Sequence, residues 1–429
     1  MKEFVKNKKL IKQILFTLLI LAVYRFGCVL TISGIDTQAA SSMMNENIFG
    51  IMNMLGGGAL SKMSVFALGV SPYITAGIVI QLLSMDVIPY LKEQTQNGQV
   101  GRLKLEKITR DLAAVIAFFQ ALSIIYGLDS QYGIFRNGGS FDYFYTAMIM
   151  ATGSMILVWL GDRITAHGIG NGISVLICAG VVSNIPSNLI QTWKILTGEA
   201  TSGQLVNGVG IFVMCIALYI LIILGVVIMD LATRRIPIQY PSSSAQSSAM
   251  NFIPFKINSS GVIPVIFASS VMSFVQLVVG LINKEAGVKV NGWLYLGRPL
   301  GLCIYVVLIV YFAYFYTMEL MNPDDIAGRL SRQQAFIPGI RPGEETKIYL
   351  KKVLYRVTFF GTLMLIVIAV LPYVLPMYTS IPASMSLGGT GIIVVVGVAM
   401  EILNAIRTEM EVKNYSNYSA GWKRMTSKI

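Results

Sequence analysis

The sequence predicts an all-α polytopic membrane protein with ten transmembrane helices in two inverted five-helix halves and a re-entrant half-helix. Of its 429 residues, 55% are hydrophobic and only 13% are charged, whereas soluble domains carry about 25% charged residues. Apolar runs long enough to span a membrane recur along the chain, and two short motifs of the first half return in the second. This pattern excludes an ordinary soluble protein with a large core.

Ten apolar runs approach or exceed the length of about 20 residues that a helix needs to cross a bilayer. They centre on residues 12–32, 65–85, 111–128, 143–161, 170–190, 209–230, 261–282, 298–318, 354–375 and 390–408. The first run, with its basic flank, also resembles a signal peptide. Nine later spans favour a first transmembrane helix.

The positive charges indicate an orientation. If both termini are cytoplasmic, 26 of the 33 Lys and Arg residues fall in the inner loops and six in the outer loops, with Arg25 inside a span. Cytoplasmic loops carry such an excess. We therefore expect cytoplasmic termini.

The residues that precede the second apolar run are unusual for a membrane span. Gly56, Gly57 and Gly58 precede a nearly uncharged stretch in which Lys62 is the one ionised side chain before residue 83. A core helix would not begin on glycines, which cost about 1 kcal/mol each relative to alanine. We expect a weakly held half-helix near 51–63, re-entrant and surrounded by protein or water, followed by a span over 65–85.

Two motifs repeat between the halves. GVSPYITA at 69–76 returns as GVIPVIFA at 261–268, and GNGISV at 170–175 returns as GTGIIV at 389–394. Five spans separate the copies, so the halves (1–200 and 201–429) are inverted. Inverted repeats place the working site between the halves, which predicts a centre lined by spans two, five, seven and ten.

Those four spans offer apolar, β-branched side chains to the centre. They are Val70, Ile74, Ile173, Ile177, Ile266 and Val394. Ordinary helix packing is one interpretation. The other is an apolar constriction that gates a water-filled path by dewetting.

Other functions find less support. A secondary transporter shares the inverted repeat but needs ionisable groups at the midplane, where the inferred lining is aliphatic. Cys28, Cys178, Cys215 and Cys303 lie far apart in apolar runs, and His167 is the single histidine, so we expect neither metal nor cofactor. With no HExxH motif or P-loop, we expect no enzyme.

Five motifs carry a resemblance to a known family. They are GGALSKMSVFALGVSPYITAGIVIQLL, GIGNGIS, GVIPVIFASS, AFIPGIRPGEET and LGGTGIIVVVGVAME. In order and spacing, over residues 12–415, the chain resembles the SecY family, the channel subunits of the bacterial Sec protein translocon. The resemblance implies a passive channel for unfolded preproteins in the bacterial cytoplasmic membrane, which also releases membrane proteins laterally into lipid.

The resemblance assigns three sets of residues. The six β-branched residues above become the pore ring. The segment that blocks the closed channel, the plug, becomes Asn53, Gly56, Gly57, Gly58, Ala59, Leu60, Ser61, Lys62 and Met63. The lateral gate between spans two and seven becomes Ser71, Pro72, Gln81, Asn258, Pro264, Ser269 and Ser270. A plug must leave its seat, so we expect its glycines to provide a flexible attachment.

The resemblance also implies partners: the SecE and SecG subunits, the SecA ATPase and the ribosome. Two cytoplasmic loops, 231–260 and 319–353, would dock them. The docking residues are Arg234, Arg235, Arg341, Pro342 and Gly343. Nucleic acid would be met only through the ribosome, whose phosphates suit basic loops.

Two departures from the family pattern weaken this docking surface. After Tyr240 the chain reads PSSSAQSS where basic residues are usual, and GQVGRLKL lacks the usual double arginine. A general translocon and an accessory channel dedicated to few substrates both remain open. Because the pore, plug and Arg341 motifs are present, we favour the general translocon.

Overall fold

The computed structural model separates into two compact units. Unit 1 comprises Met1–Ile190, Leu277–Gly287 and Val398–Ile429, and unit 2 comprises Gln191–Gln276 and Val288–Gly397. The structure describes residues 8–35, 53, 56–85, 88–133, 135, 139–197, 202–239, 252–282, 290, 292–294, 296–378 and 391–410. Each unit is described by itself.

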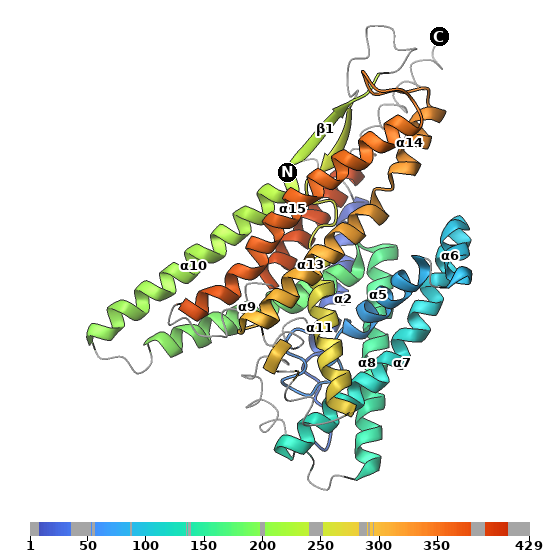
Figure 1. Cartoon of the computed structure of the whole chain (residues 1–429). Helices are drawn as coiled ribbons and strands as arrows, with labels where there is room; N and C mark the ends of the chain where they lie inside the picture. The colour runs from blue at the N-terminus through green and yellow to red at the C-terminus, as the bar shows by residue number, and fades with distance from the viewer. Residues whose placement is uncertain are drawn as a thin grey trace. The chain divides into compact units, whose positions relative to one another are not determined.

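Unit 1 is built on the long helix α7, which packs against α5, α6 and α8, while α2 packs on α8 (Figure 1). Its elements are α2 (Lys8–Gly27), α5 (Ser71–Met85), α6 (Pro89–Gln96), α7 (Gly98–Tyr132), α8 (Ser140–His167) and the first part of α9 (Gly172–Thr197). The end of the helix Gly391–Met410 also belongs to this unit.

Unit 2 is built on α15, which packs against α10, α13, α14 and β2. Its elements are α10 (Ser202–Leu231), β1 (Thr233–Pro237), β2 (Phe252–Lys256), most of α11 (Ile263–Ile282), α13 (Pro299–Leu320), α14 (Pro323–Arg332) and α15 (Glu344–Tyr378). The strands pair antiparallel, with Arg234 opposite Phe255.

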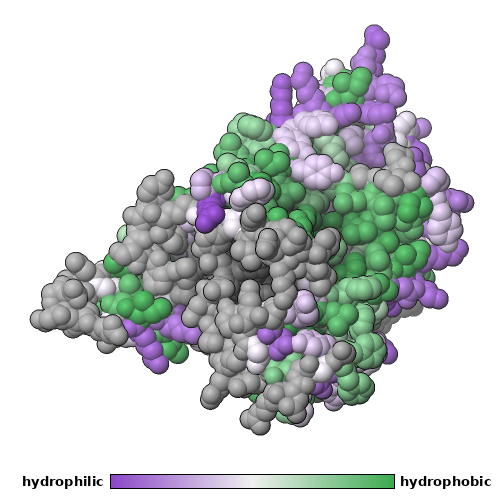
Figure 2. Space-filling model, turned by 60° about the horizontal axis from the view of Figure 1, so that its bottom comes forward, coloured by the Kyte–Doolittle hydropathy of each residue, from purple (hydrophilic) through white to green (hydrophobic). Residues whose placement is uncertain are grey.

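The helices face an apolar environment. Within the described residues, eight helices are long and apolar enough to cross a membrane. They are Lys8–Gly27, Gly98–Asp129, Phe141–His167, Gly172–Thr197, Gly208–Leu231, Pro299–Arg332, Glu344–Val374 and Gly391–Met410. Figure 2 shows hydrophobic residues exposed over a wide area of the face in view. A surface of this kind is stable only in lipid, so the chain is a multi-pass membrane protein.

Spans two and seven differ from the remaining helices. All ten predicted runs overlap a described helix, but α5 joins α6 only through a 99° bend, and the apolar helix in α11 is short, Ile263–Gln276. The predicted start of span two at residue 65 is wrong, because α5 begins at Ser71. At 1.5 Å per residue, α5 is about 22 Å long, less than the ~30 Å hydrocarbon core.

Residues 56–70, which precede α5, are not helical and pack against α8. Gly153 of α8 lies so close to this segment that an added Cβ would sit 1.9 Å from the Val65 carbonyl oxygen. Ser154 donates to the Gly69 carbonyl at 2.9 Å. A glycine at position 153 is therefore a steric requirement of the fold.

The G153A substitution should lower stability by about 1–3 kcal/mol, because it forces α8 away from the segment. Its matched control is G127A on α7, where an added Cβ meets no atom within 4 Å and the higher helix propensity of alanine should stabilise slightly. Thermal unfolding in detergent measures both changes. Equal effects of the two substitutions would contradict the packing described.

Candidate functional site

Among its described residues, the predicted plug segment is helical at Asn53 alone. Residues 56–63 form turns, so the expected half-helix over this stretch is wrong. The segment is joined to the chain after α2 by a bridge between Thr31 and Ser64. The Ile32 amide donates to the Met63 carbonyl, and the Val65 amide donates to the Leu30 carbonyl, each at 3.0 Å. This pairing satisfies backbone groups that no helix satisfies.

The segment is also the centre of an apolar core. Leu60 and Met63 are fully buried, with 0% exposure, in a cluster to which α7 and α8 contribute small side chains. These include Ala117, Ala121, Ala147 and Ala151. Alanines let the two helices approach the segment closely, and the bulky residues of the segment fill the space between them.

The glycines of the segment have a conformational role. Gly57 and Gly58 have φ of 72° and 78°, a region that side-chain-bearing residues rarely adopt. A Cβ on Gly57 would sit 3.0 Å from the Gly180 Cα of α9 and from the Tyr24 hydroxyl. The glycines thus permit a left-handed turn and close contact. Whether they also provide a flexible attachment stays a prediction.

The predicted pore-ring residues lie in both units. Val70 ends the non-helical segment, and its carbonyl accepts from the Ile74 amide at the start of α5, at 3.2 Å. In unit 1, Val70 and Ile177 are buried, and Ile74 and Ile173 are half-buried. In unit 2, Val394 is buried and Ile266 half-buried. That these six side chains form one ring stays a prediction.

The first α9 residues are positioned by a glycine hairpin. The Gly172 amide donates to the Thr165 hydroxyl at 2.9 Å, and a Cβ on Gly172 would sit 1.9 Å from the Gly161 carbonyl oxygen. Gly170 has a φ of 73°. The GIGNGIS motif therefore brings α9 back against the end of α8 and fixes the place of Ile173.

The predicted gate residues are likewise divided between the units. Ser71, Pro72 and Gln81 lie on α5, whereas Pro264, Ser269 and Ser270 lie on α11. Asn258 lies in the turn before α11.

The Asn258 side chain shapes this turn. Its amide donates to the Gly261 carbonyl at 2.9 Å, and the Ser260 hydroxyl donates to its oxygen at 3.3 Å. That Asn258 and the other six residues form a lateral gate stays a prediction.

The predicted docking residues are presented by one small subdomain, the loop platform (residues 233–239, 252–257 and 323–357). Its two loops share a core of buried residues that includes Ile236, Phe255, Leu330, Ile337 and Leu354. Gln239 and Phe336 exchange two backbone hydrogen bonds, at 2.9 and 3.0 Å.

The docking side chains lie on the surface of this platform. Arg234, Arg235, Arg341, Pro342 and Gly343 are all exposed. The Arg235 guanidinium lies 4.8 Å from the centre of the Phe252 ring, which favours an outward, ordered position. The Thr346 hydroxyl donates to the Arg341 carbonyl at 2.8 Å.

An ion pair joins two helices of the platform. Lys347 of α15 contacts Asp324 in the first turn of α14, and the Asn322 side chain caps α14 by accepting from the Asp324 amide at 3.0 Å. The serine-rich stretch after Tyr240 lies outside the described residues.

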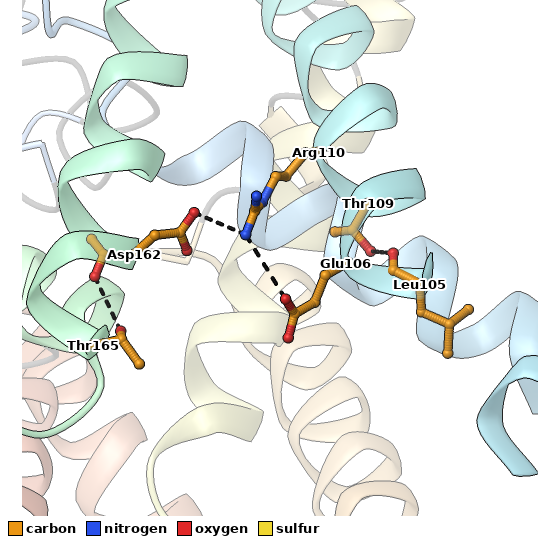
Figure 3. Close-up of polar contacts among 7 residues, drawn as sticks. Leu105, Glu106, Thr109, Arg110, Asp162 and Thr165 are labelled. Carbon is orange, nitrogen blue, oxygen red and sulfur yellow. Dashed lines mark hydrogen bonds and ion pairs between the residues drawn. The ribbon is translucent and has the colours of Figure 1, made fainter. Parts of the chain in front are cut away.

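Sequence analysis missed one polar cluster, in which Arg110 of α7 bridges two carboxylates (Figure 3). The Arg110 Nη2 atom lies 3.0 Å from Asp162 of α8 and 3.8 Å from Glu106 one turn earlier on α7. The cluster ties the charged first part of α7 to the last turns of α8. Arg110 and Asp162 lie far apart in the sequence, so no local pattern indicates that they pair.

Sequence analysis predicts that His167 and the four cysteines bind no metal. Within the described part of the chain, no group of three or more His, Cys, Asp or Glu residues could hold a metal ion. The His167 ring lies 5.8 Å from the Phe16 ring.

The fold and these elements define a class: multi-pass helical membrane proteins with a non-helical segment packed inside a helical unit. Comparison with known proteins specifies the family. The SecY family model matches residues 64–403. The protein translocase subunit SecY of Halalkalibacterium halodurans is 37% identical over 95% of this chain and 96% of its own. That of Bacillus subtilis is 35% identical over 97% and 98%.

Solved structures agree on the fold. A protein-conducting channel has a TM-score of 0.64 at 18% identity and covers 94% of each chain. Sec61 in a canine ribosome-channel complex has a TM-score of 0.60, also at 18% identity and 94% coverage. The chain belongs to the SecY family.

The Arg110 cluster can be tested by a double-mutant cycle with R110Q and D162N. Both side chains are partly exposed, so we expect a coupling free energy of about 0.5–1 kcal/mol. Thermal unfolding in detergent provides the four stabilities. R102Q, an exposed change near the start of the same helix, should leave the stability unchanged. A coupling near zero would contradict the bridge.

Proposed function

We propose that this chain is the channel-forming subunit of a protein translocase. One observation carries the proposal: SecY translocase subunits match it from end to end at 35–37% identity. In this function an unfolded preprotein crosses the membrane through the chain, and a hydrophobic segment leaves sideways into lipid. The chain itself performs no covalent chemistry.

The proposed mechanism uses both halves of the chain. Ten helices form two inverted halves, and the six β-branched side chains meet as an apolar ring between them. Such a ring accepts unlike side chains because apolar contacts select no particular chemistry, and it excludes water when empty. The segment at 53–63 seals the resting channel. A signal sequence opens the gate between α5 and α11 and displaces that segment.

The driving energy comes from outside the chain, from the SecA ATPase or from translation. The shared core of the loop platform supports docking, since it presents Arg234, Arg235 and Arg341 on one rigid unit. A ribosome would meet these arginines with RNA phosphates. SecE would brace the two halves, and SecG would join them.

Loop charge and the relatives together indicate where the chain is located. Positive charge concentrated in alternate loops supports cytoplasmic termini, and the bacterial relatives support the cytoplasmic membrane of a bacterium. The serine-rich loop after Tyr240 and the single arginine in GQVGRLKL favour the alternative of an accessory channel with few substrates. A general translocon is our main proposal.

Complementation tests the function. A bacterial host is depleted of its own SecY and supplied with this chain and a SecE from the same source organism, and export of a SecA-dependent reporter is followed. A general translocon should restore growth and export. R341E should reduce export without reducing membrane insertion of the channel, because Arg341 is exposed, whereas K92E, another exposed basic residue, should not.

Failure of a stable, inserted chain to export any reporter would contradict the general translocon. Rescue of only one class of substrate would favour the accessory channel instead.

A further inference from the structure

The glycine turn of the predicted plug (Gly56–Gly58) is held by two side chains from neighbouring helices. Arg25 of α2 donates from Nη1 to the Gly57 carbonyl at 2.7 Å. This is a short, charge-assisted bond, stronger than one between neutral groups. Because Arg25 lies in the last turn of an apolar span, its charge is poorly placed unless an acceptor is near.

Asn184 of α9 holds the same turn from another side. Its Nδ2 atom donates to the Asn53 carbonyl at 3.4 Å, and its Oδ1 atom lies 2.9 Å from the place of a Cβ on Gly58. Asn184 therefore bonds to the segment at Asn53 and occupies the space beside Gly58.

Asn53 also bonds to two later residues of the segment. Its carbonyl accepts from the Gly58 amide at 2.8 Å, and its side chain accepts from the Ser61 amide at 2.9 Å. The Ser61 hydroxyl in turn donates to the Gly58 carbonyl at 2.8 Å.

We propose that Arg25 and Asn184 are positioning residues that hold Asn53 and residues 56–63 in the seat formed by α2, α7, α8 and α9. The inference rests on the proposed function in so far as this segment is the plug. When the segment leaves its seat, Arg25 loses the Gly57 carbonyl and Asn184 loses Asn53. The two residues therefore favour the seated state, and a signal that opens the channel must break both contacts.

Close packing of the segment against α9 explains why Arg25 bonds to a backbone atom. A Cβ at Gly57 would lie 3.0 Å from the Gly180 Cα, so a glycine of the segment packs against a glycine of α9. Gly57 has no side chain, and its carbonyl is the acceptor that it offers to Arg25. Such a contact forms and breaks without changing the charge of the segment.

Hydrogen–deuterium exchange tests the proposal directly. The full-length chain, co-purified with its partner subunits in lipid nanodiscs, is compared with R25M and N184A. Peptides covering residues 56–70 should exchange about tenfold faster in R25M, as expected for loss of one charge-assisted hydrogen bond. R25K, which keeps a cationic donor, should restore much of the protection.

Two controls separate positioning from general stability. R163M removes an exposed arginine of α8 that stacks on Trp159 at 5.2 Å, and should leave the segment unchanged. Peptides covering the buried middle of α7 should exchange equally in all variants. Unchanged exchange of 56–70 in both R25M and N184A, or an equal increase in α7, would overturn the proposal.

Resting ion conductance of the same variants in planar bilayers tests the proposed function separately. If residues 53–63 plug the channel, R25M should leak more ions than R163M. Faster exchange without a leak would support the positioning role of Arg25 and Asn184 and contradict the plug.

Discussion

The requirement that every backbone polar group inside a membrane find a partner governs the first unit of this protein. Helices meet it by themselves, but residues 56–70 do not form one. Their partners include the chain after α2, Arg25, Ser154 of α8, and Asn53, which precedes the segment. Close approach is possible because α7, α8 and α9 present alanine and glycine where the segment touches them. A bulkier residue at Gly153 would separate groups that must bond.

The loop platform depends on a different interaction, an apolar core that joins two loops distant in sequence. A small apolar core provides the common support: Phe255 of β2 and Leu354 of α15 are buried in it. The reciprocal bonds between Gln239 and Phe336 join the loops at the backbone. A partner that binds Arg235 and Arg341 thereby meets one folded unit and need not order two flexible loops, which lowers the entropic cost of binding.

Much of this architecture is encoded locally and could be predicted from sequence. Apolar runs and charge distribution predict a multi-pass membrane protein, since span length and loop charge are properties of contiguous residues. The conformation of residues 56–63 was predicted wrongly. An apolar, glycine-rich stretch suggests a weak helix, while the actual turns depend on non-local contacts with Tyr24, Arg25 and Gly180. The pairing of Arg110 with Asp162 is non-local in the same way. Membership of the SecY family was predictable because five motifs keep their order over the whole chain.

In the function that we propose, an aliphatic ring between the halves separates the two aqueous sides. Resting ion conductance of the reconstituted channel with I74G and I266G tests it most directly, because glycine removes the apolar side chains without adding charge. The matched control is I156G with I220G, two exposed isoleucines of α8 and α10. If the ring is the barrier, conductance should rise clearly with the first pair of substitutions and stay unchanged with the second. Equal conductance of the two double variants would contradict it.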